Sequence, residues 1–383
     1  MKTILQTNKV LFEIDTVIDD LVKKIELLDF INPVNIEEEK AQFFASNFTK
    51  EPVFKYPKLN FNGFQLHRAF FNQKIEQIED PIVRRLYEDI IYTYMSLIEC
   101  LDNIGNGKKF YYNSLHAFGT PTERDVENAK FILHFEDKTP SKSRIPKYSS
   151  KEAEHYFRKF SKRYDFTYNI KHSKKLSAIA MVLNNIKTLV INEGHTFSKN
   201  ELRVLANHEI GVHLVTTMNG ILQPLKIFSH GLPNNVETQE GLAVYSEYMS
   251  NSLTLSRLKI LAYRVIAVDT LAKGYTFSQT FNQLKNTYNL NSEDSFYITL
   301  RVHRGGGLTK DYLYLTGLKK IYDYHAQGND LSDLLLGKVA LEYVDTIHYL
   351  KKIGLVTPIK HVNKAFDKNS NKNKLVDFIL KNL

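Results

Sequence analysis

The spacing of two histidines constrains this chain more than any other feature of its sequence. Ser198 and Glu201 match a capping box, in which the two side chains satisfy free backbone amides, so a helix is predicted to begin there. That helix then carries His208, Glu209 and His213 in the pattern HExxxH. On a straight α-helix, residues five apart point roughly 140° away from each other, whereas residues four apart differ by about 40°. A straight helix therefore cannot direct both imidazoles at one target.

One extra residue absorbed as a π-type turn restores a common face for the two histidines, and such turns recur at functional sites. Gly211 lies between the histidines, and a residue without a Cβ permits the widened turn. We therefore predict a local π-type turn between His208 and His213, with both imidazoles directed at a shared metal ion. The spacing alone also admits a pair of core or surface histidines that bind no metal.

The expected metal is a single zinc ion (Zn2+) with nitrogen and oxygen ligands. Cys100 is the lone cysteine, which excludes a cysteine-rich metal site. A catalytic zinc keeps three protein ligands and an open position, so the third ligand should be a carboxylate from another element. Glu237, Glu240 and Glu247 lie downstream, and Glu247 is placed two helical turns beyond Glu240, where it is better suited to orient a ligand. Ligand type alone also admits manganese or cobalt.

Hydrophobic periodicity predicts an α+β fold that is mostly helical, with a small sheet beside the HExxxH helix. A helical N-terminal segment over 1–80 and a catalytic domain over 81–383 are the expected divisions. The last two predicted strands are separated by a short polar turn, as in a hairpin. Helices are predicted at 10–28, 36–47, 82–104, 253–271, 277–288, 312–324 and 331–341, and strands at 166–170, 176–183 and 188–192.

The composition is that of a globular protein, with 43% hydrophobic and 24% charged residues. No window approaches the ~18 uncharged apolar residues of a membrane-spanning helix. The first residues also lack the apolar core of a signal peptide. We therefore expect a cytoplasmic protein that does not enter a membrane.

The charge distribution points to an acidic partner. The chain carries a formal net charge of +9, and residues 138–175 hold 12 basic side chains against three acidic ones. Such a segment would attract an acidic peptide tail or a nucleic acid through a field that salt screens. A nucleic acid is the weaker expectation because no nucleic-acid-binding motif accompanies the charge. The alternative is an ordinary solvated face.

Several motifs together resemble one family. The sequence QEGLA at 239–243 follows NHEIGVH at 207–213, and the segments 112–115, 118–121, 301–307 and 309–314 extend the likeness over roughly residues 80–380. In these motifs the chain resembles the flavohemoglobin expression-modulating QEGLA motif proteins, which are related to the microtubule-associated tyrosine carboxypeptidases.

The resemblance implies a zincin-like zinc carboxypeptidase that removes a C-terminal Tyr or Phe from a peptide or protein tail. It also implies that His208, His213 and Glu240 bind the metal and that Glu209 is the catalytic base. In such a site Glu209 would take a proton from the metal-activated water and return it to the leaving amine.

An enzyme that acts at a C-terminus must hold a free carboxylate, which calls for a guanidinium or an ammonium group. Arg301, Arg304 and Lys310 are the candidates, and each has the alternative of being a solvated basic side chain. Tyr314 is a candidate for the substrate pocket or the oxyanion, with core packing as its alternative. Two other functions stay open: an endopeptidase that uses the same site, and a regulatory or binding protein with a structural metal.

Overall fold

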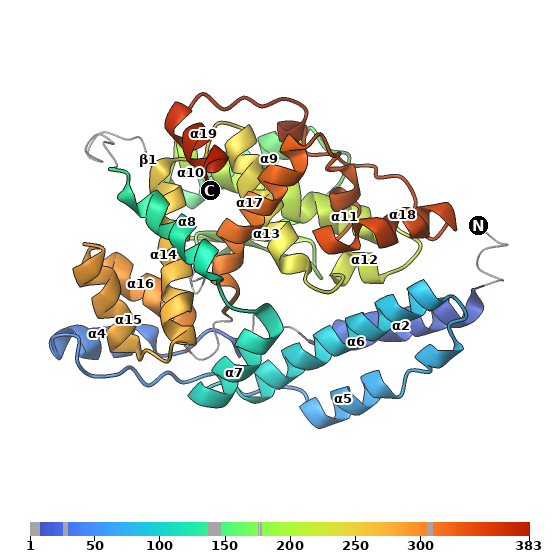
Figure 1. Cartoon of the computed structure of the whole chain (residues 1–383), viewed down its shortest axis with the longest axis horizontal. Coiled ribbons are helices and arrows are strands. Elements are labelled where there is room, and N and C mark those ends of the chain that lie inside the picture. The colour runs from blue at the N-terminus through green and yellow to red at the C-terminus, as the bar shows by residue number, and fades with distance from the viewer. Residues whose placement is uncertain (1–7, 26–29, 137–146, 175, 177, 305–308) are drawn as a thin grey trace.

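The computed structural model of this chain describes residues 8–25, 30–136, 147–174, 176, 178–304 and 309–383. Helices make up most of this part of the chain (Figure 1). A small sheet packs beside the helix that carries the two histidines. The expected α+β class, mostly helical, is therefore confirmed. Within the described ranges, no helix combines the length and the apolar character that a bilayer span requires.

The first part of the chain is helical, as predicted. The helices predicted at 36–47 and 82–104 are confirmed, whereas the one predicted at 10–28 ends at Val22, and residues 26–29 lie outside the described residues. The elements are α2 (Lys9–Val22), α4 (Ile36–Ala45), α5 (Gly63–Phe71), η1 (Ile75–Gln77), α6 (Pro81–Asp102), α7 (Gly107–Phe118), α8 (Glu123–His134) and α9 (Ser150–Ser161).

Helix α2 is tied to helices from elsewhere in the chain. The buried carboxylate of Asp15 accepts hydrogen bonds from the backbone amides of Lys226 and Ile227, at 2.7 and 3.2 Å, where the short helix α12 (Ile227–His230) begins. It also accepts one from the Tyr87 hydroxyl of α6, at 2.8 Å. The buried apolar side chains of α2 belong to the main hydrophobic core. The proposed division at residue 80 stays a prediction.

The small sheet has the strand order β2-β4-β3, which leaves β3 at one edge. Strands β3 (Ala180–Leu183) and β4 (Thr188–Asn192) form the predicted antiparallel hairpin, and β2 (Asn169–Ser173) pairs with β4 in parallel. The strand predicted at 166–170 begins three residues later because Phe166 packs against Tyr164 and His361 instead of joining the sheet. A two-stranded sheet joins β1 (Lys147–Tyr148) to β5 (Phe197–Ser198).

The histidine helix starts and widens where the sequence predicts. Ser198 and Glu201 form the capping box of α10 (Lys199–Leu205). The π-type turn is confirmed and is longer than a single bulge, because the π-helix η3 runs over nine residues (Ala206–Leu214) before α11 (Val215–Ile221) resumes α-helical geometry. Gly211 contributes through packing as well: a Cβ there would lie 2.5 Å from the side-chain nitrogen of Asn363.

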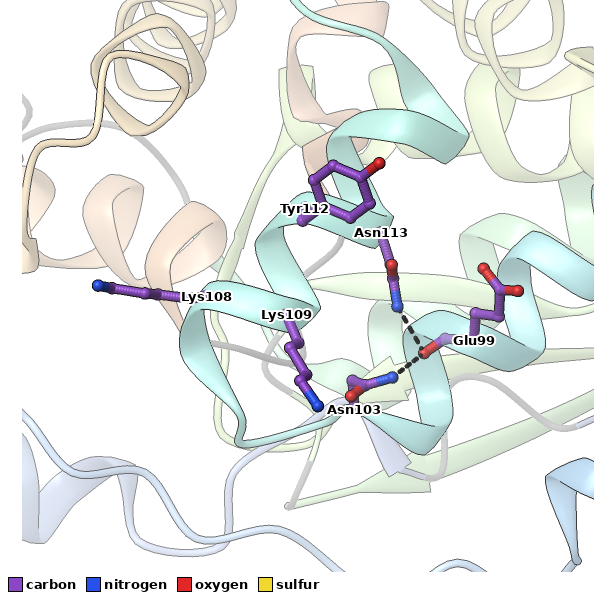
Figure 2. Close-up of a pocket in the computed structure, with 6 residues that line it drawn as sticks. All are labelled: Glu99, Asn103, Lys108, Lys109, Tyr112 and Asn113. Atoms are coloured by element: carbon purple, nitrogen blue, oxygen red, sulfur yellow. Dashed lines mark hydrogen bonds between the residues drawn. The ribbon is translucent and has the colours of Figure 1, made fainter.

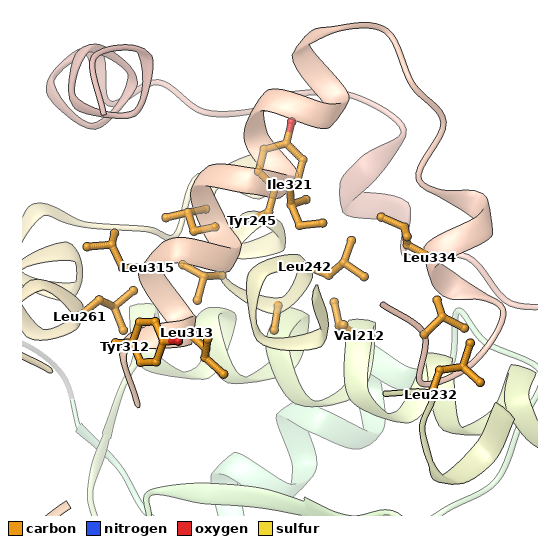
Figure 3. Close-up of a cluster of buried hydrophobic side chains, with 14 of the residues drawn as sticks. Val212, Leu232, Leu242, Tyr245, Leu261, Tyr312, Leu313, Leu315, Ile321 and Leu334 are labelled. Carbon is orange, nitrogen blue, oxygen red and sulfur yellow. The ribbon is translucent and has the colours of Figure 1, made fainter. Parts of the chain in front are cut away.

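Two glycines allow α13 (Asn235–Met249) and α17 (Leu313–Ala326) to cross at backbone contact. A Cβ on Gly241 would lie 2.4 Å from the carbonyl carbon of Gly317, and a Cβ on Gly317 would lie 2.1 Å from the carbonyl oxygen of Glu237. Figure 3 shows the apolar side chains around this crossing, among them Leu242. The close crossing fixes the position of Glu240, which directly precedes Gly241.

The predicted helix at 331–341 is wrong. The segment forms only two short 3-10 turns, η6 (Ser332–Leu335) and η7 (Leu341–Tyr343). Between them the chain bends, and Lys338 donates its backbone amide to the Phe228 carbonyl at 2.7 Å. Gly337 makes this approach possible because a Cβ there would lie 2.3 Å from the same carbonyl oxygen. This long-range pairing replaces the local helix.

The helices predicted at 253–271, 277–288 and 312–324 are confirmed in outline, although the second is completed by a π-helical turn and the third is preceded by a 3-10 turn. The elements are α14 (Leu255–Ala272), α15 (Phe277–Asn282), η4 (Gln283–Thr287), α16 (Ser292–His303), η5 (Thr309–Tyr312), α18 (Val344–Lys352), η8 (Lys364–Phe366) and α19 (Lys374–Lys381).

Candidate metal centre

The structure brings the three predicted ligands together. His208 and His213 come from η3, and Glu240 comes from α13. The Nε2 atom of His208 lies 3.6 Å from Oε2 of Glu240, and the Nε2 atom of His213 lies 3.5 Å from the same oxygen. One potential ligand atom from each of the three side chains lies within 4.8 Å of the others. We call these three residues the metal-ligand cluster.

The donor set fits a zinc ion. Glu240 Oε2 is buried and has no hydrogen-bond partner among the described residues, although it faces two imidazole nitrogens. In a tetrahedral zinc site with bonds of about 2.1 Å, ligand atoms lie roughly 3.4 Å apart. The two imidazole–carboxylate separations, 3.6 and 3.5 Å, match this value. A buried oxygen without a donor is costly, and a cation between the three groups removes that cost.

Glu247, predicted to orient a ligand, lies against His208. Its carboxylate is fully buried and accepts a hydrogen bond from Nδ1 of His208 at 2.9 Å, which leaves Nε2 directed at Glu240. Arg257 of α14 donates to both Glu247 oxygens at 3.2 Å. Burial raises the pKa of Glu247, but the Arg257 charge and the His208 hydrogen bond lower it by more, so the net pKa lies below the usual value. Glu247 therefore stays ionised and keeps a proton on Nδ1 of His208, which leaves Nε2 as the atom that can bind a metal.

The two histidines differ in basicity. Burial lowers the pKa of His213 to about 4, so this imidazole is neutral and able to bind a metal. Burial also disfavours the charged form of His208, but the nearby Glu240 carboxylate and the hydrogen bond to Glu247 raise its pKa to about 10. A proton held on His208 is the electrostatic equivalent of a cation between that imidazole and Glu240, so a metal ion would replace it.

Glu209, the residue after His208 in η3, interacts electrostatically with His208 and Glu240. It is 8% exposed, and its carboxylate accepts a hydrogen bond from the backbone amide of Val182 on the edge strand β3. Burial raises the pKa of Glu209 to about 7, against the lowering effect of the His208 charge. A carboxylate that titrates near neutrality can both accept and return a proton.

Sequence reasoning missed Lys338. This lysine is 4% exposed, and its Nζ donates to the His213 carbonyl and to the Thr216 hydroxyl, both at 3.0 Å. It thereby satisfies a carbonyl at the end of the π-helix. Burial lowers its pKa to about 7, although Glu240 and Glu209 act in the opposite direction. The signal in the sequence was a single lysine inside the apolar run from 334 to 340.

The candidate substrate-binding residues separate into two groups. Lys310 and Tyr314 lie at the centre: Lys310 Nζ is 3.5 Å from Oε1 of Glu240, and the Tyr314 ring lies parallel to that of His208 with centroids 6.4 Å apart. Arg301 instead donates two hydrogen bonds to Asp311. Arg304 donates to the side chain of Asn32 at 2.8 Å.

Glu237, the other acidic residue of α13 considered as a ligand, lies outside the metal-ligand cluster. Its carboxylate pairs with Lys320 of α17 at 2.6 Å. The segment 305–307 between Arg304 and Lys310, which contains three glycines, lies outside the described residues.

A separate surface pocket contains no residue of the metal-ligand cluster. It encloses about 400 Å³ between α6 and α7 and is lined by Glu99, Asn103, Lys108, Lys109, Tyr112 and Asn113 (Figure 2). Asn103 and Asn113 both donate to the Glu99 backbone carbonyl on its floor. The titratable side chains in its lining, Glu99, Lys108, Lys109 and Tyr112, are all exposed, so the pocket offers no buried acid or base.

The basic segment predicted at 138–175 is only partly described. Residues 137–146 and 175 lie outside the described residues. The remaining basic side chains are all exposed, and Arg158 pairs with Glu154 at 2.7 Å. Exposure of this kind fits both an ordinary solvated face and a surface for an acidic tail. The described basic residues are Lys147, Lys151, Arg158, Lys159, Lys162, Arg163, Lys171 and Lys174.

Comparisons with known proteins agree with the motifs. The model of the family described as microtubule-associated tyrosine carboxypeptidase matches residues 41–383. Microtubule-associated tyrosine carboxypeptidase 1 of Homo sapiens is 25% identical over 335 residues, which cover 83% of this chain and 61% of that protein. MATCAP2 of Mus musculus, described as a candidate tyrosine carboxypeptidase, is 25% identical over 346 residues, or 86% of this chain and 57% of that protein.

The chain therefore spans about three fifths of the length of these curated relatives. Among solved structures, the crystal structure of a candidate lipoprotein from Colwellia psychrerythraea aligns with a TM-score of 0.41 and 15% identity. That alignment covers 83% of this chain and 60% of the other.

Proposed function

Because this chain belongs to the microtubule-associated tyrosine carboxypeptidase family, we propose that it is a zinc carboxypeptidase that removes a C-terminal Tyr or Phe from peptides or protein tails. The observation that carries the proposal is the buried Oε2 of Glu240, which faces the Nε2 atoms of His208 and His213 without a hydrogen-bond partner in the described chain. In this proposal the fold is a zincin-like metallopeptidase built around η3.

His208, His213 and Glu240 would hold the zinc ion. When bound there, zinc supplies Lewis-acid polarisation of a peptide carbonyl and lowers the pKa of water. Lys310 supports the arrangement because its ammonium lies 3.5 Å from Oε1 of Glu240, which leaves Oε2 for the metal. Glu247 fixes the His208 ring by accepting from Nδ1.

Glu209 would act as the general base and then as the general acid. Its carboxylate, with a pKa of about 7, can take a proton from water and give it to the leaving amine. The hydrogen bond from the Val182 amide holds one side of the carboxylate in place. Glu209 follows His208 directly, so the base and a metal ligand are placed by the same helical segment.

The proposed substrate is a protein tail, as the names of the relatives suggest. The exposed basic side chains of α9 and β2 would favour an acidic tail through long-range attraction. A cytoplasmic location is proposed with this substrate. Neither a membrane nor a nucleic acid is part of the proposal.

The test is release of the final residue from synthetic peptides, followed by mass spectrometry. The zinc-loaded protein should remove a C-terminal Tyr or Phe from peptides with a free carboxylate, and a chelator should abolish the release. Glu209→Gln should keep zinc and fold, since glutamine can still accept from the Val182 amide, and should lower kcat by roughly 10²- to 10⁴-fold.

The other functions predict different results. An endopeptidase would cleave amidated and free peptides at internal bonds with equal efficiency. A regulatory protein with a structural metal would bind zinc and release no amino acid from any peptide, and Glu209→Gln would then change nothing. Either result would contradict the proposed carboxypeptidase.

A further inference from the structure

Three arginines lie beside the metal-ligand cluster, and only two of them have a carboxylate partner of their own. Arg257 and Arg264 come from α14, and Arg301 comes from α16. We call them the arginine cluster. Arg257 pairs with Glu247, and Arg301 pairs with Asp311 through two hydrogen bonds. Two carboxylates therefore serve three guanidinium groups.

Arg264 is the guanidinium left without a carboxylate of its own. Its side chain is 11% exposed, and its Nε is buried without a hydrogen-bond partner among the described residues. The carboxylate oxygen that pairs with it, Oδ2 of Asp311, lies 3.9 Å away and already accepts from Arg301. Burial and the Arg301 charge lower the pKa of Arg264 to about 10. A buried cation in this state is costly unless an anion joins it.

Arg264 is also placed next to the metal-ligand cluster. Its guanidinium carbon lies 5.1 Å from the centroid of the Tyr314 ring. The same ring lies parallel to that of His208, with centroids 6.4 Å apart. Tyr314 therefore contacts both a metal ligand and the unmatched guanidinium. In a peptide, the terminal carboxylate lies one residue beyond the last peptide carbonyl, or about 3.5 Å of chain.

We propose that Arg264, beside the Tyr314 ring, binds the terminal carboxylate of the substrate. This inference rests on the proposed function and names the group that would make the enzyme act at a C-terminus. A planar guanidinium matches a carboxylate with two parallel hydrogen bonds, which a lysine cannot reproduce. Arg301 is less suited because Asp311 occupies its fork.

Arg304 also lacks a carboxylate partner, and its Nε is buried without a hydrogen-bond partner in the described chain. It interacts electrostatically with Arg301 and Asp311, but its guanidinium donates to Asn32 and also has Tyr56 as a neighbour, both in the N-terminal part of the chain. Glu240 and Tyr314, which both influence Arg301, are not among its electrostatic neighbours. Arg264 packs on the Tyr314 ring beside His208, whereas Arg304 is paired with Asn32, so Arg264 is the better placed of the two.

The test measures binding, so that it does not depend on turnover. Calorimetry on the zinc-loaded Glu209→Gln protein would compare N-acetyltyrosine with N-acetyltyrosine amide. We expect the acid to bind roughly 10- to 100-fold more tightly than the amide, as a charge-assisted pair requires. Adding Arg264→Met should reduce that preference to within about twofold, and Arg264→Lys should restore only part of it.

Arg203→Met is the matched control. Arg203 is a half-buried arginine of α10 that donates to the Ser250 carbonyl at 2.6 Å and takes no part in the arginine cluster. Its removal should leave the preference for the acid unchanged. Thermal unfolding and zinc content of each variant would establish that the fold is intact.

Two outcomes would overturn the inference. The first is an undiminished preference for the acid in Arg264→Met; if thermal stability falls at the same time, Arg264 only packs on Tyr314. The second is the absence of any preference in the parent protein. The proposed function is tested separately: if the protein hydrolyses no peptide but shows the Arg264-dependent preference, the activity is wrong and the carboxylate site stands.

Discussion

The metal-ligand cluster and the arginine cluster are neighbours with opposite imbalances of charge. In the first, Glu240 and two imidazoles converge without a donor to satisfy Oε2 of Glu240. In the second, three guanidinium groups share the carboxylates of Glu247 and Asp311. The first cluster is completed by a cation and the second by an anion. A peptide that ends in a free carboxylate offers that anion within one residue of the carbonyl that a metal would polarise.

Two residues join the clusters. Glu247 accepts from His208 of one cluster and from Arg257 of the other. Tyr314 lies against His208 and Arg264. Substitutions that act on one cluster alone, or on both, therefore test whether the metal-ligand cluster and the arginine cluster form one substrate-binding site.

The largest effect should come from Gly317, whose helix crosses α13 and begins at the arginine cluster. In Gly317→Ala, the new Cβ would lie 2.1 Å from the Glu237 carbonyl oxygen, so α13 and α17 must move apart. We expect the free energy of unfolding to fall by about 3 kcal/mol, the upper end for overpacking. Both zinc affinity and the preference for a free carboxylate should fall with it. Chemical denaturation would measure the stability.

Gly107→Ala is the control for Gly317→Ala, because a Cβ at Gly107 would meet only the Tyr111 ring, at an ordinary 3.8 Å. This change should have little effect on stability. Equal stability of the two variants would mean that α13 and α17 are not in backbone contact, and the placement of Glu240 would need another cause.

Glu247→Gln should separate the clusters. Glutamine keeps an acceptor for His208 but loses the charge that holds Arg257 and fixes the imidazole tautomer. We expect zinc affinity to fall about 10- to 100-fold, as is typical when the partner of a metal-binding histidine is removed. The preference for a free carboxylate should remain, because Arg264 is untouched. Competition with a zinc indicator would measure the affinity.

Glu237→Gln serves as the control on the same helix, since Glu237 pairs with Lys320 at the surface and lies outside both clusters. Zinc affinity in this variant should equal that of the parent. A loss in Glu237→Gln as large as in Glu247→Gln would contradict the assignment of these two carboxylates.

The smallest expected effect is on the free energy of unfolding at acidic pH. It concerns Glu201, which caps the helix that leads into the metal-ligand cluster. Burial raises the pKa of Glu201, but hydrogen bonds with His195 and Ser198 lower it more, to about 2 from 4.5. The folded-state pKa is depressed, so Glu201 stabilises the protein above pH 4.5, and this contribution is lost as the pH falls toward 2.

The size of the Glu201 effect is limited because the side chain is 37% exposed and solvent screens its interactions. Glu201→Gln should therefore be slightly less stable than the parent at neutral pH and should approach it in acid. Urea unfolding at several pH values would measure the difference. A constant difference at all pH values would show that the carboxylate charge at the α10 cap contributes nothing.

The two clusters also differ in how far the sequence predicts them. The π-helix and the role of Glu247 follow from spacing along the chain, because His208 and His213 share one helix and Glu240 and Glu247 share another. These are local relations, and a helix repeat determines them. The capping box at Ser198 is local in the same way.

Arg264 and Lys338 were not predictable in this way. Lys338 contacts the His213 carbonyl across 125 positions of sequence, and Arg264 lies in a helix whose pattern reads as ordinary packing. Arg301 looked free in the sequence, but Asp311 neutralises it. The backbone hydrogen bond from Lys338 to Phe228 likewise replaces the helix predicted at 331–341. In each case a distant partner decides the role, and one sequence does not reveal which segments meet.

The most direct test of the central claim is a crystal structure of the zinc-loaded Glu209→Gln protein with anomalous diffraction recorded at the zinc edge. The account predicts a single zinc peak bound by Nε2 of His208, Nε2 of His213 and Oε2 of Glu240, at about 2.0–2.2 Å from each. A stoichiometric zinc bound by other side chains, or a zinc-loaded structure in which these three groups remain unbound, would contradict it.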